Sequence, residues 1–353
     1  MGFFSTDFLT WLDDQAEAID QHSGGPADEL LKRIAQEGAF RLAVPQSLGG
    51  RGGSRQEVID LLSELAQHSL TASFIAWGHA TFIYNILKSD NPYFRDHYLP
   101  QLLSADYAGA TGLSNAVKFL ADLEEVNVEI TEEDGQLYLE GRLPWVTNLR
   151  SDRFLAVFAA GFRDGGRPYV IAVPSDAVGL SRSEDLEFVT LQGGNTAALT
   201  FDKVALKQEW ILSTDAPVFL AQNRPTFLGY QLGMALGLAE RSLQEVEASL
   251  GQRTVLHDEW LAQKTALEHI RSSLFEGLEQ EEYFIQHPRE LFQLRIDIVD
   301  VVAQSLLLEL QAGGGRGYFS QSPSGFIRRW REGAFLPIVS PSAVQLRHIL
   351  NAS

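Results

Sequence analysis

Three short segments of this sequence carry residue types that are able to do chemistry. Gln311 to Tyr318 reads Gln-Ala-Gly-Gly-Gly-Arg-Gly-Tyr, and its glycines would let the backbone approach an anion such as a pyrophosphate and present N–H groups to it. The same pattern is typical of a helix C-cap followed by a connector. Trp145 and Thr147 stand at the end of a strand pattern. That tryptophan would either present its indole to a flat cofactor ring or pack in the core.

Several common catalytic signatures are missing. The sequence has no Cys, which excludes disulfides, thiolate nucleophiles and Cys-ligated metal sites. It also has no HExxH and no P-loop pattern, and we predict no metal site. Gly112 to Ala116, Gly-Leu-Ser-Asn-Ala, is close to the nucleophile turn of serine hydrolases. It ends in Ala, however, and does not lie in a βαβ pattern.

Charge and length limit the class of partner. The 28 Lys and Arg against 46 Asp and Glu give a formal net charge of −18, which opposes binding to nucleic acid and to anionic lipid. The most apolar stretch, Ile298 to Leu310, is interrupted by polar residues and predicts a buried helix. We expect a cytoplasmic protein whose 353 residues form two or three domains and whose partner is a small molecule.

The hydrophobic period changes twice along the chain, which divides it into three zones. Apolar residues recur at helical spacing in residues 1–104, alternate with polar residues in 105–212, and return to helical spacing in 213–353. This order predicts an α+β fold, mostly α, with an N-terminal helical domain, a central antiparallel β domain and a C-terminal four-helix bundle.

Local signals refine this division. Ser54 is expected to cap a helix after a glycine-rich loop, and Asp134-Gly135 is expected to turn between two strands. The strand candidates are Val126–Ile130, Leu137–Leu139, Phe154–Phe158, Tyr169–Val173 and Ala197–Phe201.

Five segments, in this order, resemble motifs of the acyl-CoA dehydrogenase superfamily, and the resemblance runs from about residue 28 to the end. The third resembles the family's GxKxWITN and the fourth its QxxGGxGY. The segments are Val44–Gly52, Tyr98–Leu102, Gly141–Asn148, Gln311–Tyr318 and Arg328–Glu332.

The resemblance implies an FAD between the β domain and the helical bundle, in a homodimer or homotetramer whose neighbouring subunit contributes to the site. Thr111 would hydrogen-bond the pyrimidine edge of the flavin. Trp145 and Thr147 would cover one face and the N5 side of the ring.

The resemblance also implies contacts to the rest of the FAD. Arg253 would reach the pyrophosphate, with a solvated helix residue as the alternative. Gln311, Gly314 and Gly315 would meet the adenine half.

Two departures from the family pattern bear on function. Val117 replaces the family's pyrophosphate-binding serine, unless Ser114 takes that role. Ser340 stands where the family has its catalytic Glu, and Asn223 occupies the alternative Glu position. Removal of the α-proton of an acyl thioester needs a base, and an isolated serine hydroxyl is almost never ionised at neutral pH.

Three functions remain open. The first is α,β-dehydrogenation of an acyl thioester such as an acyl-CoA, with an electron-transfer partner. Flavin-dependent monooxygenases of the same fold lack the Glu and use O₂ and a reductase. For that chemistry His79 is the candidate hydrogen-bond donor, and its alternative is a structural histidine. The third is a catalytically silent member that binds flavin or an acyl group.

Overall fold

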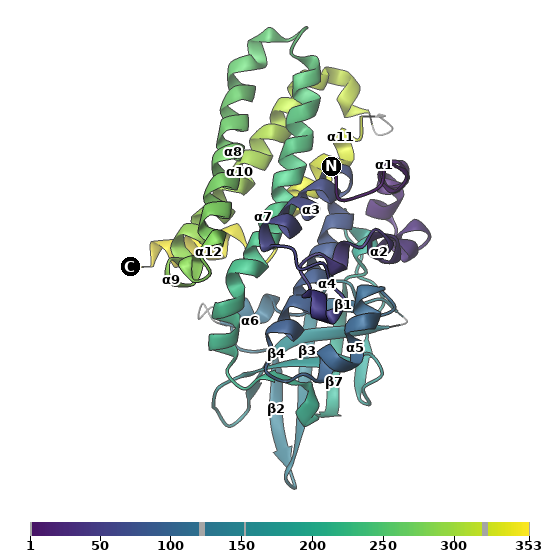
Figure 1. Cartoon of the computed structure of the whole chain (residues 1–353), viewed down its shortest axis with the longest axis vertical. Coiled ribbons are helices and arrows are strands. Elements are labelled where there is room, and N and C mark those ends of the chain that lie inside the picture. The colour runs from purple at the N-terminus through teal and green to yellow at the C-terminus, as the bar shows by residue number, and fades with distance from the viewer. Residues whose placement is uncertain (1, 120–123, 152, 320–323, 353) are drawn as a thin grey trace.

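The computed structural model describes residues 2–119, 124–151, 153–319 and 324–352. Helices form the first part of the chain, strands the middle and helices the rest (Figure 1). The N-terminal helices are α1 (Thr6–Gln21), α2 (Pro26–Gln36), α3 (Arg55–His68), α4 (Leu70–Lys88) and α5 (Tyr93–Leu103). The C-terminal helices are α7 (Ala216–Ser249), α8 (His257–Glu279), α9 (Tyr283–Gln286), α10 (Pro288–Gly313), α11 (Phe326–Phe335) and α12 (Ala343–Asn351).

The strands lie between these two helical parts in the sequence. Its strands are β1 (Ala108–Thr111), β2 (Val128–Glu133), β3 (Gln136–Val146), β4 (Phe154–Phe162), β5 (Tyr169–Pro174), β6 (Leu180–Arg182), β7 (Ala197–Ala205) and β8 (Ile211–Ser213), with the short helix α6 (Ser114–Phe119) after β1. We keep the domain boundaries at residues 104 and 212 as a proposal, because helices end at Leu103 and resume at Ala216.

The alternating segments form strands as predicted. Four of the five strand candidates fall within β3, β4, β5 and β7, and the first, Val126–Ile130, overlaps β2 from Val128 onward. The residues between β2 and β3, Asp134 and Gly135, both have positive φ (50° and 81°), as a tight hairpin turn requires. The sheet is mainly antiparallel in the order β6-β7-β3-β2-β4-β5-β8. Two pairings, β1 with β4 and β2 with β4, are parallel.

Helix α4 is the centre of the N-terminal part, because it is buried on almost every side. It packs between α3, α7 and β1, so its apolar residues surround the helix instead of forming one stripe. Its neighbour α3 begins at the predicted cap. Ser54 Oγ accepts the Glu57 amide proton, and the Glu57 carboxylate accepts the Ser54 amide proton.

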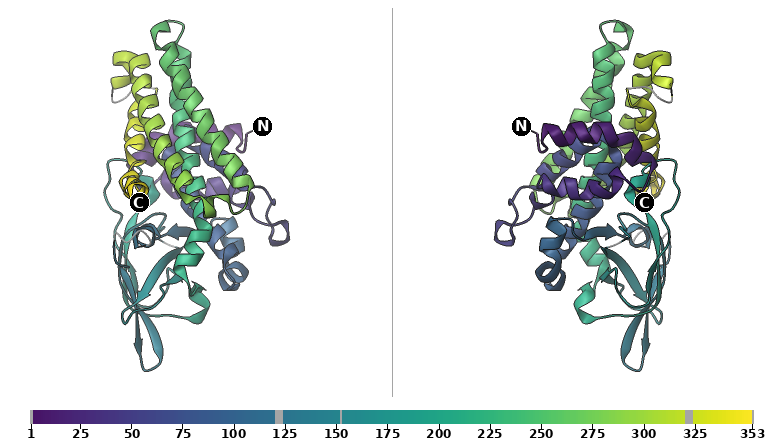
Figure 2. Two further views of the ribbon diagram at one scale, coloured as in Figure 1. Left: turned by 90° about the vertical axis from the view of Figure 1, so that its left-hand side faces the viewer. Right: turned by 90° about the vertical axis from the view of Figure 1, so that its right-hand side faces the viewer.

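The C-terminal bundle consists of three long helices, α7, α8 and α10, completed by the shorter α12 against α10. Figure 2 shows the bundle extending away from the sheet, with the N-terminal helices along its side. Helix α7 also lies directly on α3. A Cβ on Gly237 would lie 2.0 Å from the carbonyl oxygen of Ser63, so only glycine permits this approach.

The arginine-rich segment Arg328–Glu332 lies within α11 and connects this helix to its neighbours. Arg328 pairs at 2.9 Å with Glu332, which also accepts the amide proton of Leu70 at the start of α4. Arg329 pairs with Glu309 of α10, and both side chains are buried. Arg331 pairs at 3.0 Å with the buried Asp20 of α1. These pairs fix α11 against three other helices.

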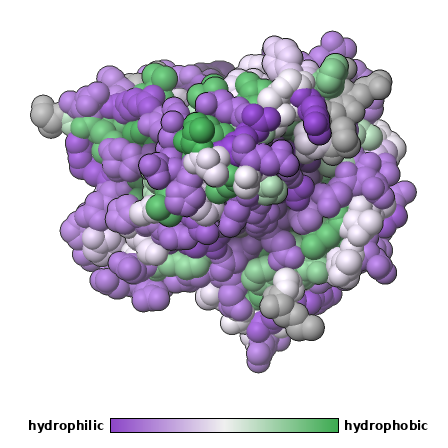
Figure 3. All heavy atoms as spheres, turned by 90° about the horizontal axis from the view of Figure 1, so that it is seen from above, coloured by the Kyte–Doolittle hydropathy of each residue, from purple (hydrophilic) through white to green (hydrophobic). Residues whose placement is uncertain are grey.

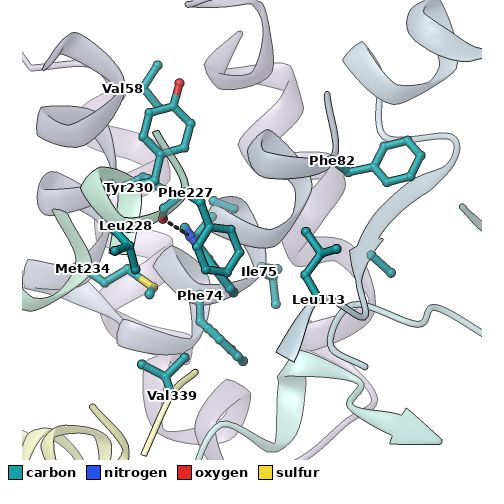
Figure 4. Close-up of a cluster of buried hydrophobic side chains, with 14 of the residues drawn as sticks. Val58, Phe74, Ile75, Phe82, Leu113, Phe227, Leu228, Tyr230, Met234 and Val339 are labelled. Carbon is teal, nitrogen blue, oxygen red and sulfur yellow. Dashed lines mark hydrogen bonds between the residues drawn. The ribbon is translucent and has the colours of Figure 1, made fainter. Parts of the chain in front are cut away.

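Apolar side chains from α3, α4, α7 and the segment before α12 meet at the junction of the three parts (Figure 4). Within this cluster, the Trp77 indole Nε1 donates to the carbonyl oxygen of Phe227 (3.2 Å). The surface seen from the bundle end is mostly hydrophilic, with scattered hydrophobic residues (Figure 3). In the part of the chain that the structure describes, no helix is both long enough and apolar enough to cross a bilayer.

Candidate functional site

Two cavities lie at the junction of the sheet and the helices. The helix cavity, about 160 Å³, is walled by α4, α7, α10 and α12 together with Leu113 and Val117. The strand cavity, about 270 Å³, lies at the end of β3 and is lined by Gly112, Ser114 and Trp145 among others. Leu113 therefore borders one cavity while the residues on either side of it border the other. This turn, together with the start of α6, forms a wall shared by the two cavities.

Of the residues predicted to hold the flavin ring, Trp145 lines the strand cavity, and Thr147 follows it two residues later in the chain. Thr111 and Thr147 are paired by an isolated β-bridge, and both are buried. The Thr147 hydroxyl lies 3.2 Å from that of Thr196. Trp145 is 54% exposed and contacts Phe188 at 5.9 Å between ring centroids. Its indole is thus available at the surface and is not a core residue.

Ser340 lies in the loop between α11 and α12, next to the wall between the cavities. Its hydroxyl is 2.6 Å from that of Ser114. Gln231 Nε2 donates to the Ser340 carbonyl oxygen (2.8 Å). The buried Arg295 in turn donates to Gln231 Oε1 (3.3 Å) and to the Leu336 carbonyl oxygen (2.7 Å). The loop is therefore held through its backbone by two buried side chains that the sequence patterns did not single out.

Of the two positions at which the resemblance places a catalytic carboxylate, Asn223 lines the helix cavity, whereas Ser340 does not line it and only its neighbour Pro341 does. No residue lining this cavity, among those that the structure describes, is Asp or Glu. Val117 lines the helix cavity whereas Ser114 lines the strand cavity, so of these two residues Ser114 is the one that borders the same cavity as Trp145.

His79 lies apart from both cavity linings. It is fully buried, its Nδ1 accepts the amide proton of Gly109 (2.9 Å), and its Nε2 lies 2.8 Å from the Leu102 carbonyl oxygen. The ring packs 4.1 Å from that of Phe40 between centroids. Burial lowers its pKa to about 4. Both nitrogens of the neutral ring are already used, so we propose a structural role for His79 instead of the donor role predicted from the sequence.

The residues predicted to bind the other half of the FAD form a second set at the far end of the bundle. Arg253 follows α7, and Gln311, Gly314 and Gly315 lie at the end of α10. A Cβ on Gly314 would lie 3.2 Å from Arg253 Nη2, so these residues are neighbours. Figure 1 places this tip of the bundle opposite the sheet. One chain therefore does not bring the two sets together.

Arg224 is a residue of the helix cavity that sequence reasoning missed. It lies in α7 beside Asn223 and lines the cavity. One signal was present in the sequence: the residues three and four positions away, Leu220, Ala221, Phe227 and Leu228, include no carboxylate that could pair with it.

Comparisons with known proteins show which family this chain resembles. Residues 10–106 match the family model "Acyl-CoA dehydrogenase, N-terminal domain". The mitochondrial isovaleryl-CoA dehydrogenase of Arabidopsis thaliana is 21% identical over 330 residues, which cover 89% of this chain and 80% of that protein. The acyl-CoA dehydrogenase of Bacillus subtilis (strain 168) is 23% identical over 312 residues, covering 84% and 82%.

Solved structures share the fold over nearly the whole chain. Glutaryl-coenzyme A dehydrogenase in its glutaryl-CoA complex has a TM-score of 0.82 at 16% identity and covers 98% of this chain and 94% of its own. Butyryl-CoA dehydrogenase from Megasphaera elsdenii has a TM-score of 0.81 at 17% identity, covering 98% and 96%. With the fold, the ordered motifs and these relatives in agreement, the chain belongs to the acyl-CoA dehydrogenase superfamily.

Proposed function

We propose that this protein is an FAD-dependent oxidoreductase that oxidises a small acyl substrate, such as an acyl thioester. The observation that carries the proposal is the pair of cavities that share the segment 112–118 in their linings. One is mainly apolar and suits an acyl chain. The other is lined by the exposed indole of Trp145 and by Ser114.

The chain's residues fit an FAD in two halves. When bound, the flavin would supply a two-electron acceptor. Trp145 offers an aromatic face for stacking, and Thr111 and Ser114 offer hydroxyls beside it. At the bundle tip, Arg253 is exposed beside glycines, and a Cβ on Gly313 or Gly315 would meet nothing within 4 Å. An exposed guanidinium beside an open backbone suits a phosphate group.

The separation of these two sets supports a homo-oligomer with shared sites. In this proposal, the strand cavity of one subunit receives Arg253 and Gln311 to Gly315 from its neighbour. A symmetric dimer would then contain two equivalent sites, each incomplete in one subunit alone.

Anaerobic mixing with butanoyl-CoA tests the proposed function. The purified protein is expected to bind FAD and to lose its yellow colour on addition of this thioester. A protein that stays colourless with added FAD would overturn the proposal and favour a silent member of the family.

A flavin monooxygenase is the second candidate, and the lack of Asp or Glu in the described lining of the helix cavity favours it. It predicts no bleaching by butanoyl-CoA. It also predicts that reduced flavin, supplied by a separate reductase, is consumed with O₂ in a substrate-dependent way. The same anaerobic experiment therefore separates the two reactions.

Arg253→Ala is expected to weaken FAD binding. Loss of a hydrogen bond to a charged group costs about 1.5–3 kcal/mol, which corresponds to about a 10- to 150-fold rise in Kd. The measurement is fluorescence titration of the apoprotein with FAD. Gln252→Ala, at an adjacent exposed residue, is the control. An unchanged Kd in Arg253→Ala would remove that residue from the site.

Mixing two defective variants examines whether sites are shared. Trp145→Glu is expected to fold, because the indole is 54% exposed, and to disturb the flavin half. Unfolded and refolded together with Arg253→Ala, it should yield a mixture in which about half of the dimers are heterodimers. Each heterodimer has one intact site, so about a quarter of all sites in the mixture are intact. Flavin content that stays at the level of the separate variants would argue for sites built within one chain.

A further inference from the structure

Arg224 presents a guanidinium to the helix cavity that the proposed reaction has not used. Its Nε is buried and has no hydrogen-bond partner among the described residues. Its Cζ lies 5.2 Å from the centre of the Phe292 ring on α10, a cation–π contact that orients the group. The partly buried arginine is therefore held in place, and its Nε has no hydrogen-bond acceptor among the described residues.

Arg224 also has no counterion in the cavity. The lining residues that the structure describes include no Asp or Glu, although the whole chain has 18 more acidic than basic residues. Burial lowers the pKa of the Arg224 guanidinium. A desolvated cation without a partner is costly in an apolar site, so the arrangement favours an anionic ligand.

Two threonine residues that line the same cavity also have hydroxyl groups without hydrogen-bond partners in the described part of the chain. Thr81 Oγ1 of α4 and Thr226 Oγ1 of α7 are buried, line the cavity and have no hydrogen-bond partner among the described residues. Together with Arg224 Nε they are three buried polar atoms, from two helices, that lack described hydrogen-bond partners in residues lining one cavity. The cavity volume of about 160 Å³ corresponds to roughly ten waters, enough for a short acyl chain ending in a carboxylate.

We propose that the helix cavity binds the acyl end of a substrate that carries a carboxylate, with Arg224 as its counterion and Thr81 and Thr226 as hydroxyl donors. This inference rests on the proposed function, since it assigns the substrate class of the same site. It makes Arg224 a specificity-determining residue. The substrate class is then a short dicarboxylic acid bound as a monothioester.

Succinyl-CoA and butanoyl-CoA provide a matched test, because both have four carbons and differ in the terminal carboxylate. Binding to the FAD-loaded protein is measured by calorimetry. The wild type is expected to bind succinyl-CoA at least about tenfold more tightly, as a charge-assisted hydrogen bond implies. Arg224→Gln should abolish or reverse this preference, whereas Arg224→Lys should retain part of it.

The flavin content of each variant is measured alongside, because a change at Arg224 should leave it unaltered. Equal binding of the two esters by the wild type, or an unchanged preference in Arg224→Gln, would overturn the proposal. If neither ester binds, the thioester part of the proposed function fails, and free succinate and succinamide decide the role of Arg224. Preferential binding of succinate that is lost in Arg224→Gln supports the role, and its absence refutes it.

Discussion

Asn223→Glu is expected to let butanoyl-CoA bleach the flavin on the order of a hundredfold faster than in the wild type. Asn223 lines the helix cavity at a position where the family resemblance places a carboxylate. A positioned general base contributes about 10²- to 10⁴-fold to a proton transfer. The new carboxylate would be mostly buried and adjacent to Arg224 in the chain, so desolvation and the cation would shift its pKa in opposite directions. Stopped-flow absorbance under anaerobic conditions measures the rate.

Asn223→Gln is the matched control, since it has the length of Glu without the charge. Its bleaching rate should remain at the wild-type level. Asn223 Nδ2 donates to Asn85 Oδ1 (3.2 Å), so thermal unfolding of both variants checks that this contact is not the cause of any change. Equal rates in Asn223→Glu and Asn223→Gln would show that the missing base does not limit the reaction.

Glu309→Leu is expected to lower the free energy of unfolding by about 3–5 kcal/mol, the cost of leaving one partner of a buried ion pair alone. The side chains of Glu309 and Arg329 are 5% and 2% exposed. Glu245 forms a second, longer ion pair with Arg329 at 3.9 Å, and its side chain is 30% exposed. Urea denaturation followed by circular dichroism measures the change.

The double variant Glu309→Leu/Arg329→Leu separates charge from packing. Because it removes both charges, it should recover most of the lost stability. A double variant as unstable as the single one would mean that the shape of the two side chains matters more than their charges. A single variant within about 1 kcal/mol of wild type would contradict the ion-pair argument.

The sequence predicted most strands because alternation is a local property. Val128 to Ile130 and Leu137 to Leu139 show it clearly, and they form β2 and β3. Strand β1, Ala108–Thr111, consists of small residues and is buried along its whole length, so it has no alternation to detect. Its parallel pairing with β4 depends on the path of the intervening chain, which no local pattern encodes.

The candidate site was predictable only where a motif named its residues. The resemblance identified Thr111, Trp145 and Thr147, and the structure brings them together. It did not indicate that Arg253 lies beyond reach of them within one chain. Arg224 had no motif, and its role depends on a cavity formed by helices far apart in sequence.

The loop that carries Ser340 is held through a backbone carbonyl group, which every amino acid possesses. Gln231 holds residue 340 by its carbonyl oxygen, while the side chain makes a separate contact to Ser114. A replacement of Ser340 would therefore change the chemical group beside Ser114 without removing the backbone hydrogen bond to Gln231. At such a position, related proteins with the same fold can carry different side chains and so acquire different reactions.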